Sequence, residues 1–266
     1  MNRTSISDLK LAAKDQLLGN YGIATGSFAL LFVLIYLLMS VVMSAFMFTI
    51  TQNGTASQAV MTLSQEIEAN IVGMAIGAIS VTFSVGYIYI MFKIARNERA
   101  SISDLFFVFR NHPDKVIIIS LIMTVIQFIL LLPATIVKPR QFGMPGQDLD
   151  GKRLLVWVIL YVAGFAVSFV VDLMLAMSFM IYLDDPSESV LSIVRTSIEM
   201  MRGNKFRYFY MILSFIGYWF LAVLSLGIAF LWVVPYQTMT IVQFYSDLKE
   251  PSQITSPEKG PESEGI

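Results

Sequence analysis

The sequence predicts an all-α, polytopic membrane protein with about six transmembrane helices, and three observations indicate this fold class. The chain of 266 residues is 56% hydrophobic and only 14% charged, whereas soluble domains carry about 25% charged residues. Several apolar runs reach the roughly 20 residues that a helix needs to cross about 30 Å of hydrocarbon. A polar motif, "SISDL", precedes long apolar runs at Ser5–Leu9 and again at Ser101–Leu105. The bilayer is therefore the expected solvent for most of the chain.

Six apolar segments are the expected spans. The sixth is less apolar and is interrupted by Pro235, which membrane helices tolerate where neighbours or water satisfy the freed carbonyl. Residues 1–248 would form one integral membrane domain. The polar, Pro-rich and acidic residues 249–266 would form a disordered cytoplasmic tail. In chain order, the expected spans are residues 23–48, 71–92, 116–137, 154–182, 208–226 and 227–245.

The distribution of basic residues predicts the orientation. With six spans, the N-terminal tail, the second loop and the fourth loop lie on one side, and these segments carry most of the Lys and Arg residues. Residues 51–70, on the other side, contain neither. Because short cytoplasmic loops carry the excess of basic residues, both termini are expected in the cytoplasm. The expected location is the bacterial cytoplasmic membrane, with the lipid bilayer as the first partner.

The repeated motif predicts helix starts. In "SISD" a Ser is followed three positions later by an Asp, so the Ser side chain can accept a bond from a backbone N–H while the acid reaches back. A third helix start with a different sequence is "DPSESVLSIVRTSIEMMRGN", where the first Asp would be the N-cap and a Glu follows it three positions later. The expected cap residues are Ser5 with Asp8, Ser101 with Asp104, and Asp185 with Glu188.

Apolar residues at helical spacing follow each of these caps and predict three amphipathic helices. Each helix is expected to end near Asn20, Asn111 or Asn204, just before the next apolar run. The nearly equal intervals predict three repeats of about 92 residues, each an amphipathic helix and a two-span hairpin. The helices would either lie in the cytoplasmic interface or pack against span ends. Their expected apolar faces are Ile6, Leu9, Ala13 and Leu17; Ile102, Leu105, Phe106 and Phe109; and Val190, Val194, Ile198 and Met201.

Three stretches carry a family resemblance: "LKLAAKDQLLGNYG", "MMRGNKFRYF" and "LSFIGYWFLAVLSLGIAFLWVVPYQTMTIVQFYSDL". They resemble a family of uncharacterised multipass proteins, found mainly in Gram-positive bacteria and known as domain of unknown function number 975. The resemblance covers nearly the whole span region. One departure is Tyr218, which intervenes between the Gly and the Trp of the third stretch. The resemblance implies an integral membrane location and provides no catalytic residue to carry over.

Asp172 is the ionisable residue well inside a predicted span, where a carboxylate is expensive and usually faces a partner or a wet cavity. Gly164, Ser168, Asp172 and Ala176 lie four apart, on one face of small residues, so Asp172 is expected to point inward. One hypothesis is a protonatable or ligand-binding carboxylate in a transport path. The other is a structural acid that ties helices together. The helix break expected at Pro235 could expose carbonyls to a ligand. The expected companions of Asp172 are Gln127, Pro235, Tyr236, Gln237 and Gln243.

Small residues predict close helix contacts at two further places. Gly73 and Gly77 form a GxxxG pattern, which fits either a dimer seam or, as we prefer, close packing inside the bundle. Gly164 and Ser168 are expected to pack against another span.

Composition and motifs exclude several function classes. The absence of Cys excludes disulfides and thiolate sites, and His112, the single His, cannot form a metal site alone. The net charge of -1 argues against general nucleic-acid binding. "DDPSE" at Asp184–Glu188 is weak evidence for a magnesium-diphosphate enzyme, since such chemistry needs a second carboxylate set. No nucleophile or phosphate-binding motif occurs. We therefore expect no enzyme activity, metal or cofactor.

Two functional hypotheses follow. The first is a non-enzymatic scaffold or accessory subunit for an envelope or export process, with a membrane-protein partner or a second copy of the chain. The alternative is a small transporter or lipid-handling carrier that uses Asp172 and Pro235. A cavity that reaches Asp172 would favour the carrier, whereas a dry, tightly packed interior would favour the scaffold.

Overall fold

The computed structural model describes residues 4–52, 63–137 and 151–249, and these ranges contain helices and no strand. The all-α fold class is therefore confirmed. In chain order the helices are α1 (Ile6–Leu17), α2 (Tyr21–Gln52), α3 (Leu63–Ala95), the 3₁₀ helix η1 (Ile102–Phe106), α4 (Phe107–Arg110), α5 (Pro113–Val137), α6 (Gly151–Leu175), α7 (Ser178–Asp184), α8 (Val190–Met201), α9 (Lys205–Leu213), α10 (Ile216–Leu224) and α11 (Phe230–Lys249).

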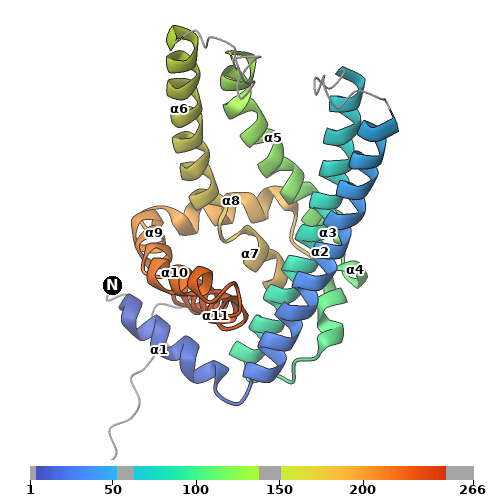
Figure 1. The fold of residues 1–266 in the computed structure, drawn as a ribbon. Helices are drawn as coiled ribbons and strands as arrows, with labels where there is room; N and C mark the ends of the chain where they lie inside the picture. The colour runs from blue at the N-terminus through green and yellow to red at the C-terminus, as the bar shows by residue number, and fades with distance from the viewer. Residues whose placement is uncertain (1–3, 53–62, 138–150, 250–266) are drawn as a thin grey trace, which may run out of the picture.

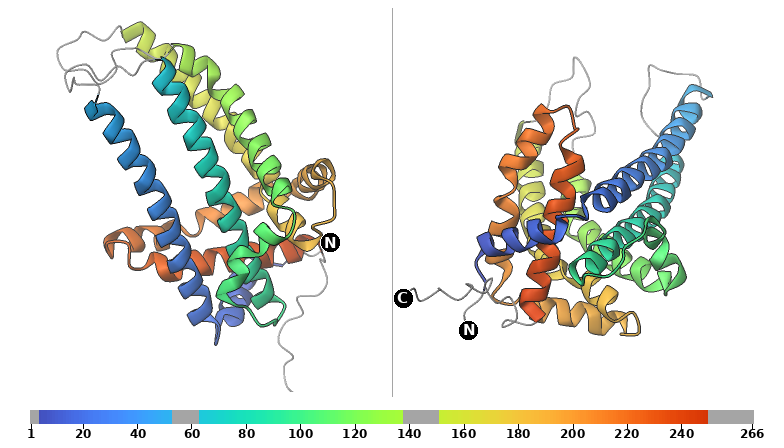
Figure 2. Two further views of the ribbon diagram at one scale, coloured as in Figure 1. Left: turned by 90° about the vertical axis from the view of Figure 1, so that its right-hand side faces the viewer. Right: turned by 90° about the horizontal axis from the view of Figure 1, so that it is seen from below.

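Two long helix pairs dominate the shape. α2 packs against α3, α5 packs against α6, and both pairs project to the same side of the molecule (Figure 1). α8 to α11 lie at the base of α6, and the α10–α11 hairpin runs across the direction of the long helices (Figure 2). α1 packs along α11 and also contacts α3. Three times along the chain, a short helical segment precedes two longer helical segments: α1 precedes α2 and α3, η1 and α4 precede α5 and α6, and α8 precedes α9–α10 and α11. This is the element order expected of three repeats, and the repeats themselves remain a prediction.

Five segments of the described chain are long and apolar enough to cross a membrane, and they correspond to the first five predicted spans. The sixth predicted span, residues 227–245, is helical as α11 but is not among them. Gln237, Thr240 and Gln243 interrupt its apolar sequence, and much of α11 is buried. Six spans are therefore not confirmed. The five candidates are Tyr21–Ser44, Ile76–Ala95, Pro113–Val137, Gly151–Asp184 and Lys205–Leu224.

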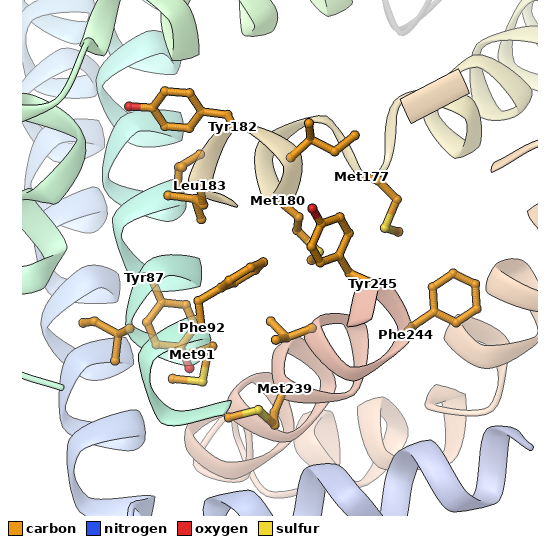
Figure 3. Close-up of a cluster of buried hydrophobic side chains, with 14 of the residues drawn as sticks. Tyr87, Met91, Phe92, Met177, Met180, Tyr182, Leu183, Met239, Phe244 and Tyr245 are labelled. Atoms are coloured by element: carbon orange, nitrogen blue, oxygen red, sulfur yellow. The ribbon is translucent and has the colours of Figure 1, made fainter. Parts of the chain in front are cut away.

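The core lies where α3, α7 and α11 meet (Figure 3). Met residues fill much of this space, and such flexible side chains fit an irregular junction of helices that cross in different directions. Burial of this cluster fixes α7 and α11 between the long pairs. The labelled members are Tyr87, Met91 and Phe92 of α3; Met177, Met180, Tyr182 and Leu183 in and before α7; and Met239, Phe244 and Tyr245 of α11.

The two "SISD" motifs start helices. Ser5 is the N-cap of α1 and accepts a bond from the Asp8 backbone N–H at 3.1 Å. Ser101 and Asp104 form a capping box at η1, with the Ser101 N–H donating to Asp104 Oδ2 at 2.8 Å.

The third predicted cap was wrong by four residues. Ser189, and not Asp185, is the N-cap of α8. Asp185 instead accepts bonds from the Ser187 backbone N–H at 2.9 Å and from the Ser187 hydroxyl at 2.5 Å, so it closes the turn before the helix. Glu188 accepts from Ser192 Oγ at 2.6 Å. The local turn uses the carboxylate that was expected to cap the helix.

The apolar faces of the short helices pack into the protein. In α1, Leu9, Ala13 and Leu17 are fully buried, as expected. In α8 the buried residues are Ile193, Ser197 and Met201, so the predicted face was correct only in part. At η1 and α4, Leu105 and Val108 are buried, whereas Ile102, Phe106 and Phe109 are exposed. The chain there forms a 3₁₀ turn first, which changes the face that a continuous α-helix would bury.

Glycine contacts divide into tight and open positions. A Cβ added at Gly164 would lie 2.8 Å from the Leu130 carbonyl oxygen, so α6 approaches α5 closely there, and Ser168 is buried on the same face. Gly86 is tighter still, because an added Cβ would lie 2.0 Å from the Leu105 carbonyl oxygen. By contrast, no atom of the described residues lies within 4 Å of a Cβ added at Gly73 or Gly77. The expected close packing of that GxxxG pair inside the bundle is therefore wrong for this structure.

The helix breaks lie where the sequence did not predict them. The fourth predicted span, residues 154–182, is interrupted at Ala176 and Met177 between α6 and α7. Pro235, in contrast, is buried inside a continuous α11. It is the sixth residue of that helix, which begins at Phe230, and because Pro has no N–H it removes the backbone bond to the Leu231 carbonyl without ending the helix.

The chain also breaks between α9 and α10. Polar side chains from other elements bond to backbone carbonyls at this break and at the one between α6 and α7. Ser197 Oγ donates to the Met174 carbonyl at 2.9 Å, at the end of α6. Lys10 Nζ donates to the Ser214 carbonyl at 3.2 Å, at the end of α9, and burial lowers the pKa of the Lys10 ammonium. Such partners replace the bonds that a continuous helix would make. They also attach α1 and α8 to the longer arms.

Candidate functional site

An open pocket of about 550 Å³ lies between α6 and the helices α9, α10 and α11; we call it the α6 groove. Ligand pockets commonly measure about 300–1,000 Å³ and combine apolar walls with a few polar groups. The α6 groove has this character, since its walls are mainly aliphatic and aromatic. It is lined by Phe169, Asp172, Leu173, Ala176, Tyr208, Phe209, Ile212, Leu213, Ile216, Trp219, Gln237 and Ile241.

Asp172 brings a carboxylate to this groove. It lies one turn before the end of α6 and is exposed, whereas Gly164 and Ser168, on the same face, are buried, and Gly164 lies against α5. The expected inward orientation is therefore corrected: the small-residue face opens into the groove at its last turn. Gln127 of α5 donates from Nε2 to Asp172 Oδ1 at 2.9 Å. The predicted pairing of Asp172 with an amide from another span is thus present in the structure.

Gln237 is the second predicted residue that lines the groove. Its Oε1 accepts a bond from the indole Nε1–H of Trp219 at 2.9 Å, which ties α11 to α10. The bond orients the indole ring and leaves the Gln237 amide nitrogen free of any hydrogen bond within the described residues. The groove therefore combines a carboxylate on one wall with an amide on another.

The remaining predicted companions do not line the groove. Tyr236 packs against the rings of Phe215 and Tyr218, at centroid distances of 5.3 and 5.8 Å. Gln243 is buried further along α11, and Pro235 is buried inside the helix without breaking it. Asp172, Gln127 and Gln237 are therefore the part of the predicted constellation that the fold brings together.

Two ionic clusters of the structure were not predicted from the sequence. In the first, Asp184 accepts from Arg96 Nη2 at 2.5 Å and from the Tyr245 hydroxyl at 3.0 Å, and it pairs with Lys249. It joins Arg96, which directly follows α3, to α7 and α11.

In the second cluster, Asp247 pairs with Arg207, with 2.6 Å between Oδ2 and Nη1. The Asp247 side chain is only 1% exposed. Thr4 donates to Asp247 Oδ1 through its hydroxyl at 2.5 Å, and Arg207 Nη2 donates to the Thr4 carbonyl at 2.6 Å. A signal was present in the sequence, because an Asp follows directly on the apolar run of α11 and a buried carboxylate needs a cation.

The acidic "DDPSE" segment is engaged inside the protein. Asp184, Asp185 and Glu188 each accept the bonds given above, and Lys115 Nζ donates to the carbonyls of Pro186, Ser187 and Glu188 at 2.7 to 3.0 Å. The hydrogen bond from Ser187 also lowers the pKa of the exposed Asp185 carboxyl. Within the described ranges, no group of three or more His, Cys, Asp and Glu side chains is placed to hold a metal ion.

Comparison with known proteins identifies one family. The sequence model described as "Protein of unknown function (DUF975)" matches residues 1–252. No curated protein and no solved structure matches the chain significantly.

Proposed function

The chain belongs to the DUF975 family of unknown function, and we propose that it is a non-enzymatic, lipid-handling protein that binds a membrane amphiphile in the α6 groove. The observation that carries this proposal is the open pocket of about 550 Å³ that reaches the Asp172 carboxylate. An amphiphile has an apolar body and a polar head, and the groove offers apolar walls together with Asp172 and Gln237. Of the two hypotheses drawn from the sequence, the carrier now takes precedence over the scaffold.

We propose a multi-pass location in the bacterial cytoplasmic membrane with six crossings and both termini in the cytoplasm. The Thr4 backbone N–H donates to Asp247 Oδ1 at 3.2 Å, so the two ends of the described chain meet. A chain whose ends share one face crosses the membrane an even number of times. Five candidate spans are an odd number, so we propose α11 as the sixth crossing, although its hairpin with α10 lies across the long helices (Figure 2). The excess of basic residues in the N-terminal tail and in the second and fourth loops supports the cytoplasmic assignment.

We also propose that the chain contains three repeats. Asn20, Asn111 and Asn204 each donate from the side-chain amide to the carbonyl four residues earlier, at 3.1, 3.0 and 2.7 Å. Each also donates from its backbone N–H to the carbonyl three residues earlier. α1 and α8 are both 12 residues long, and each has an N-cap Ser at the same distance from its terminal Asn. The same closing device at three equivalent places supports descent from one unit.

Native mass spectrometry of the protein purified gently from its own membrane tests the proposed function. Wild type is compared with Asp172→Asn, which keeps the side-chain volume, and with the control Asp15→Asn, an exposed carboxylate on α1. We expect an adduct of lipid-like mass on wild type and on Asp15→Asn, and a several-fold weaker adduct on Asp172→Asn. The absence of any adduct, or equal retention by all three proteins, would contradict amphiphile binding at Asp172.

A second candidate function is the scaffold or accessory subunit, and one observation favours it. Among the described residues, no atom lies within 4 Å of a Cβ added at Gly73 or Gly77 of α3, which leaves room for the backbone of another helix. The occupant would be a membrane-protein partner or a second copy of the chain. A stoichiometric protein companion in the same mass spectra, released by Gly77→Leu and retained by Asp172→Asn, would favour this function.

A further inference from the structure

We infer that the ligand of the α6 groove is a membrane amphiphile with an ammonium head group. This inference rests on the proposed function, because it names the chemical class of the molecule that the groove would hold. Three features carry it: the unpaired charge of Asp172, the absence of cations from the lining, and the aromatic side chains around the carboxylate.

The first feature is a carboxylate without a cation. Within the described residues, no Lys, Arg or His nitrogen lies within 4.0 Å of the Asp172 carboxylate, and its hydrogen-bond partner is the neutral amide of Gln127. By contrast, Asp184 and Asp247, at the helix ends, each pair with a basic side chain. A charge near apolar surroundings is stabilised by an opposite charge, and a ligand can supply it.

The second feature is the charge of the side chains that line the groove. None of the residues that line the groove is Lys, Arg or His. An anionic head group would meet the Asp172 carboxylate without a compensating cation, which is unfavourable at short range. A neutral head group could bond to Asp172 or Gln237 but would leave the charge unbalanced. A head group with one positive charge is therefore the complement of this site.

The third feature is aromatic. Phe169, Tyr208, Phe209 and Trp219 line the groove, and ammonium groups are attracted to aromatic faces within about 6 Å. The protein uses this contact close by, since Lys10 Nζ lies 4.3 Å from the ring centroid of Phe215. A carboxylate beside several aromatic rings is a suitable environment for a primary or quaternary ammonium. The aliphatic walls would then contact the apolar part of the same molecule.

The test uses quenching of Trp219, which lies in the groove, in full-length protein held in a neutral detergent. The chain has three Trp residues, so Trp157→Phe and Trp232→Phe leave Trp219 as the single reporter. The probes share a bromoundecyl chain, with bromine as the quencher at its end. Their head groups are trimethylammonium, hydroxyl and carboxylate, so that the chain is constant and the head group is cationic, neutral or anionic.

We expect saturable quenching, with an affinity for the trimethylammonium probe about tenfold higher than for the alcohol. Asp172→Asn should abolish this preference and leave the affinity for the alcohol unchanged. Asp172→Glu, which keeps the charge, and the control Asp15→Asn should retain the preference. If Asp172→Asn does not fold, Asp172→Glu and the head-group series in the otherwise unchanged protein still decide the inference.

The possible failures are distinguishable. Equal affinity for the three head groups, a preference for the carboxylate, or a preference that survives Asp172→Asn would overturn the ammonium inference and leave amphiphile binding intact. The absence of saturable quenching by any probe would overturn both. The mass of the native adduct then separates an amine-headed lipid from a free lipophilic amine.

Discussion

Gly86 illustrates how one residue position can determine the packing of a whole element. It lies in α3 at the point where η1 crosses, and an added Cβ would lie 2.0 Å from the Leu105 carbonyl oxygen and 3.0 Å from the Leu105 Cα. A contact under 3.0 Å with backbone cannot be relieved by a rotamer change. The GxxxG pattern at Gly73 and Gly77 predicted close packing, yet among the described glycines the tightest contact is at Gly86, outside any motif. A contact between distant segments gives no local signal.

Gly86→Ala should therefore destabilise the protein, by about 1–3 kcal/mol or more, since overpacking against backbone forces α3 and η1 apart. Gly77→Ala is the matched control on the same helix, because its added Cβ has no neighbour within 4 Å in the part of the chain that the structure describes. Its expected effect is neutral or slightly stabilising, as Ala is the better helix former. Thermal unfolding of both variants in detergent measures the difference. Equal midpoints for the two variants would contradict the close contact at Gly86.

At the scale of elements, the sequence was most informative where structure is decided locally. Ser5 and Ser101 were correctly expected to start helices, because a capping bond joins residues three apart. The cap of α8 was misplaced because two local motifs compete for neighbouring residues: Asp185 closes a turn with Ser187, and Ser189 then begins the helix. Sequence spacing allowed both arrangements, and the path of the chain out of α7 selected one.

The Arg207 and Asp247 pair holds α11 against α9 and the N-terminal segment. The side chains of Arg207 and Asp247 are 17% and 1% exposed, so removal of one partner leaves a buried charge. Arg207→Ala should cost about 3–5 kcal/mol of unfolding free energy. Arg195 and Glu199 form an exposed i,i+4 pair, with side chains 80% and 64% exposed, and Arg195→Ala should cost at most about 0.5 kcal/mol.

A double-mutant cycle with Asp247→Asn measures the coupling between the two partners. Each variant is unfolded in the same detergent, and the interaction energy is the departure of the double variant from additivity. A strong coupling at Arg207 and Asp247, beside a weak one at Arg195 and Glu199, is the expected result. If Arg207→Ala costs no more than Arg195→Ala, the pair does not anchor α11.

At the scale of the whole molecule, the apolar runs were predictable and their arrangement was not. Hydropathy located five apolar segments that are mainly helical in the structure, the fourth and the fifth each as two helices. The α6 groove, however, needs Asp172 from α6 and Gln237 from α11, and their proximity depends on how α9 to α11 cross the base of α6. Periodicity shows which face of a helix is polar, but it does not show which other helix that face meets. Asp172 was therefore identified as a candidate, whereas the aromatic lining with Trp219 was missed.

The contact between Thr4 and Asp247 predicts that both ends of the chain lie on one side of the membrane. The protein contains no Cys, so each introduced Cys is a single, unambiguous label. In intact cells, a membrane-impermeant maleimide should label neither Lys14→Cys nor Ser263→Cys, and it should label both after permeabilisation. Gly54→Cys, in the first predicted external loop, should be labelled without permeabilisation and serves as the positive control. Labelling of only one end from outside would require an odd number of crossings and would contradict the prediction.

The turn between α10 and α11 decides between six crossings and four. If both α9–α10 and α11 cross the membrane, Leu226, which is 94% exposed at this turn, lies on the external side. If neither crosses, Leu226 stays on the side of the two termini. Because α10 and α11 form one hairpin, the two alternatives predict opposite labelling of Leu226→Cys with no change in the labelling of Lys14→Cys. We expect Leu226→Cys to react with the impermeant maleimide in intact cells. Protection until permeabilisation would instead mean that the hairpin remains on the cytoplasmic side, beneath four membrane-spanning helices.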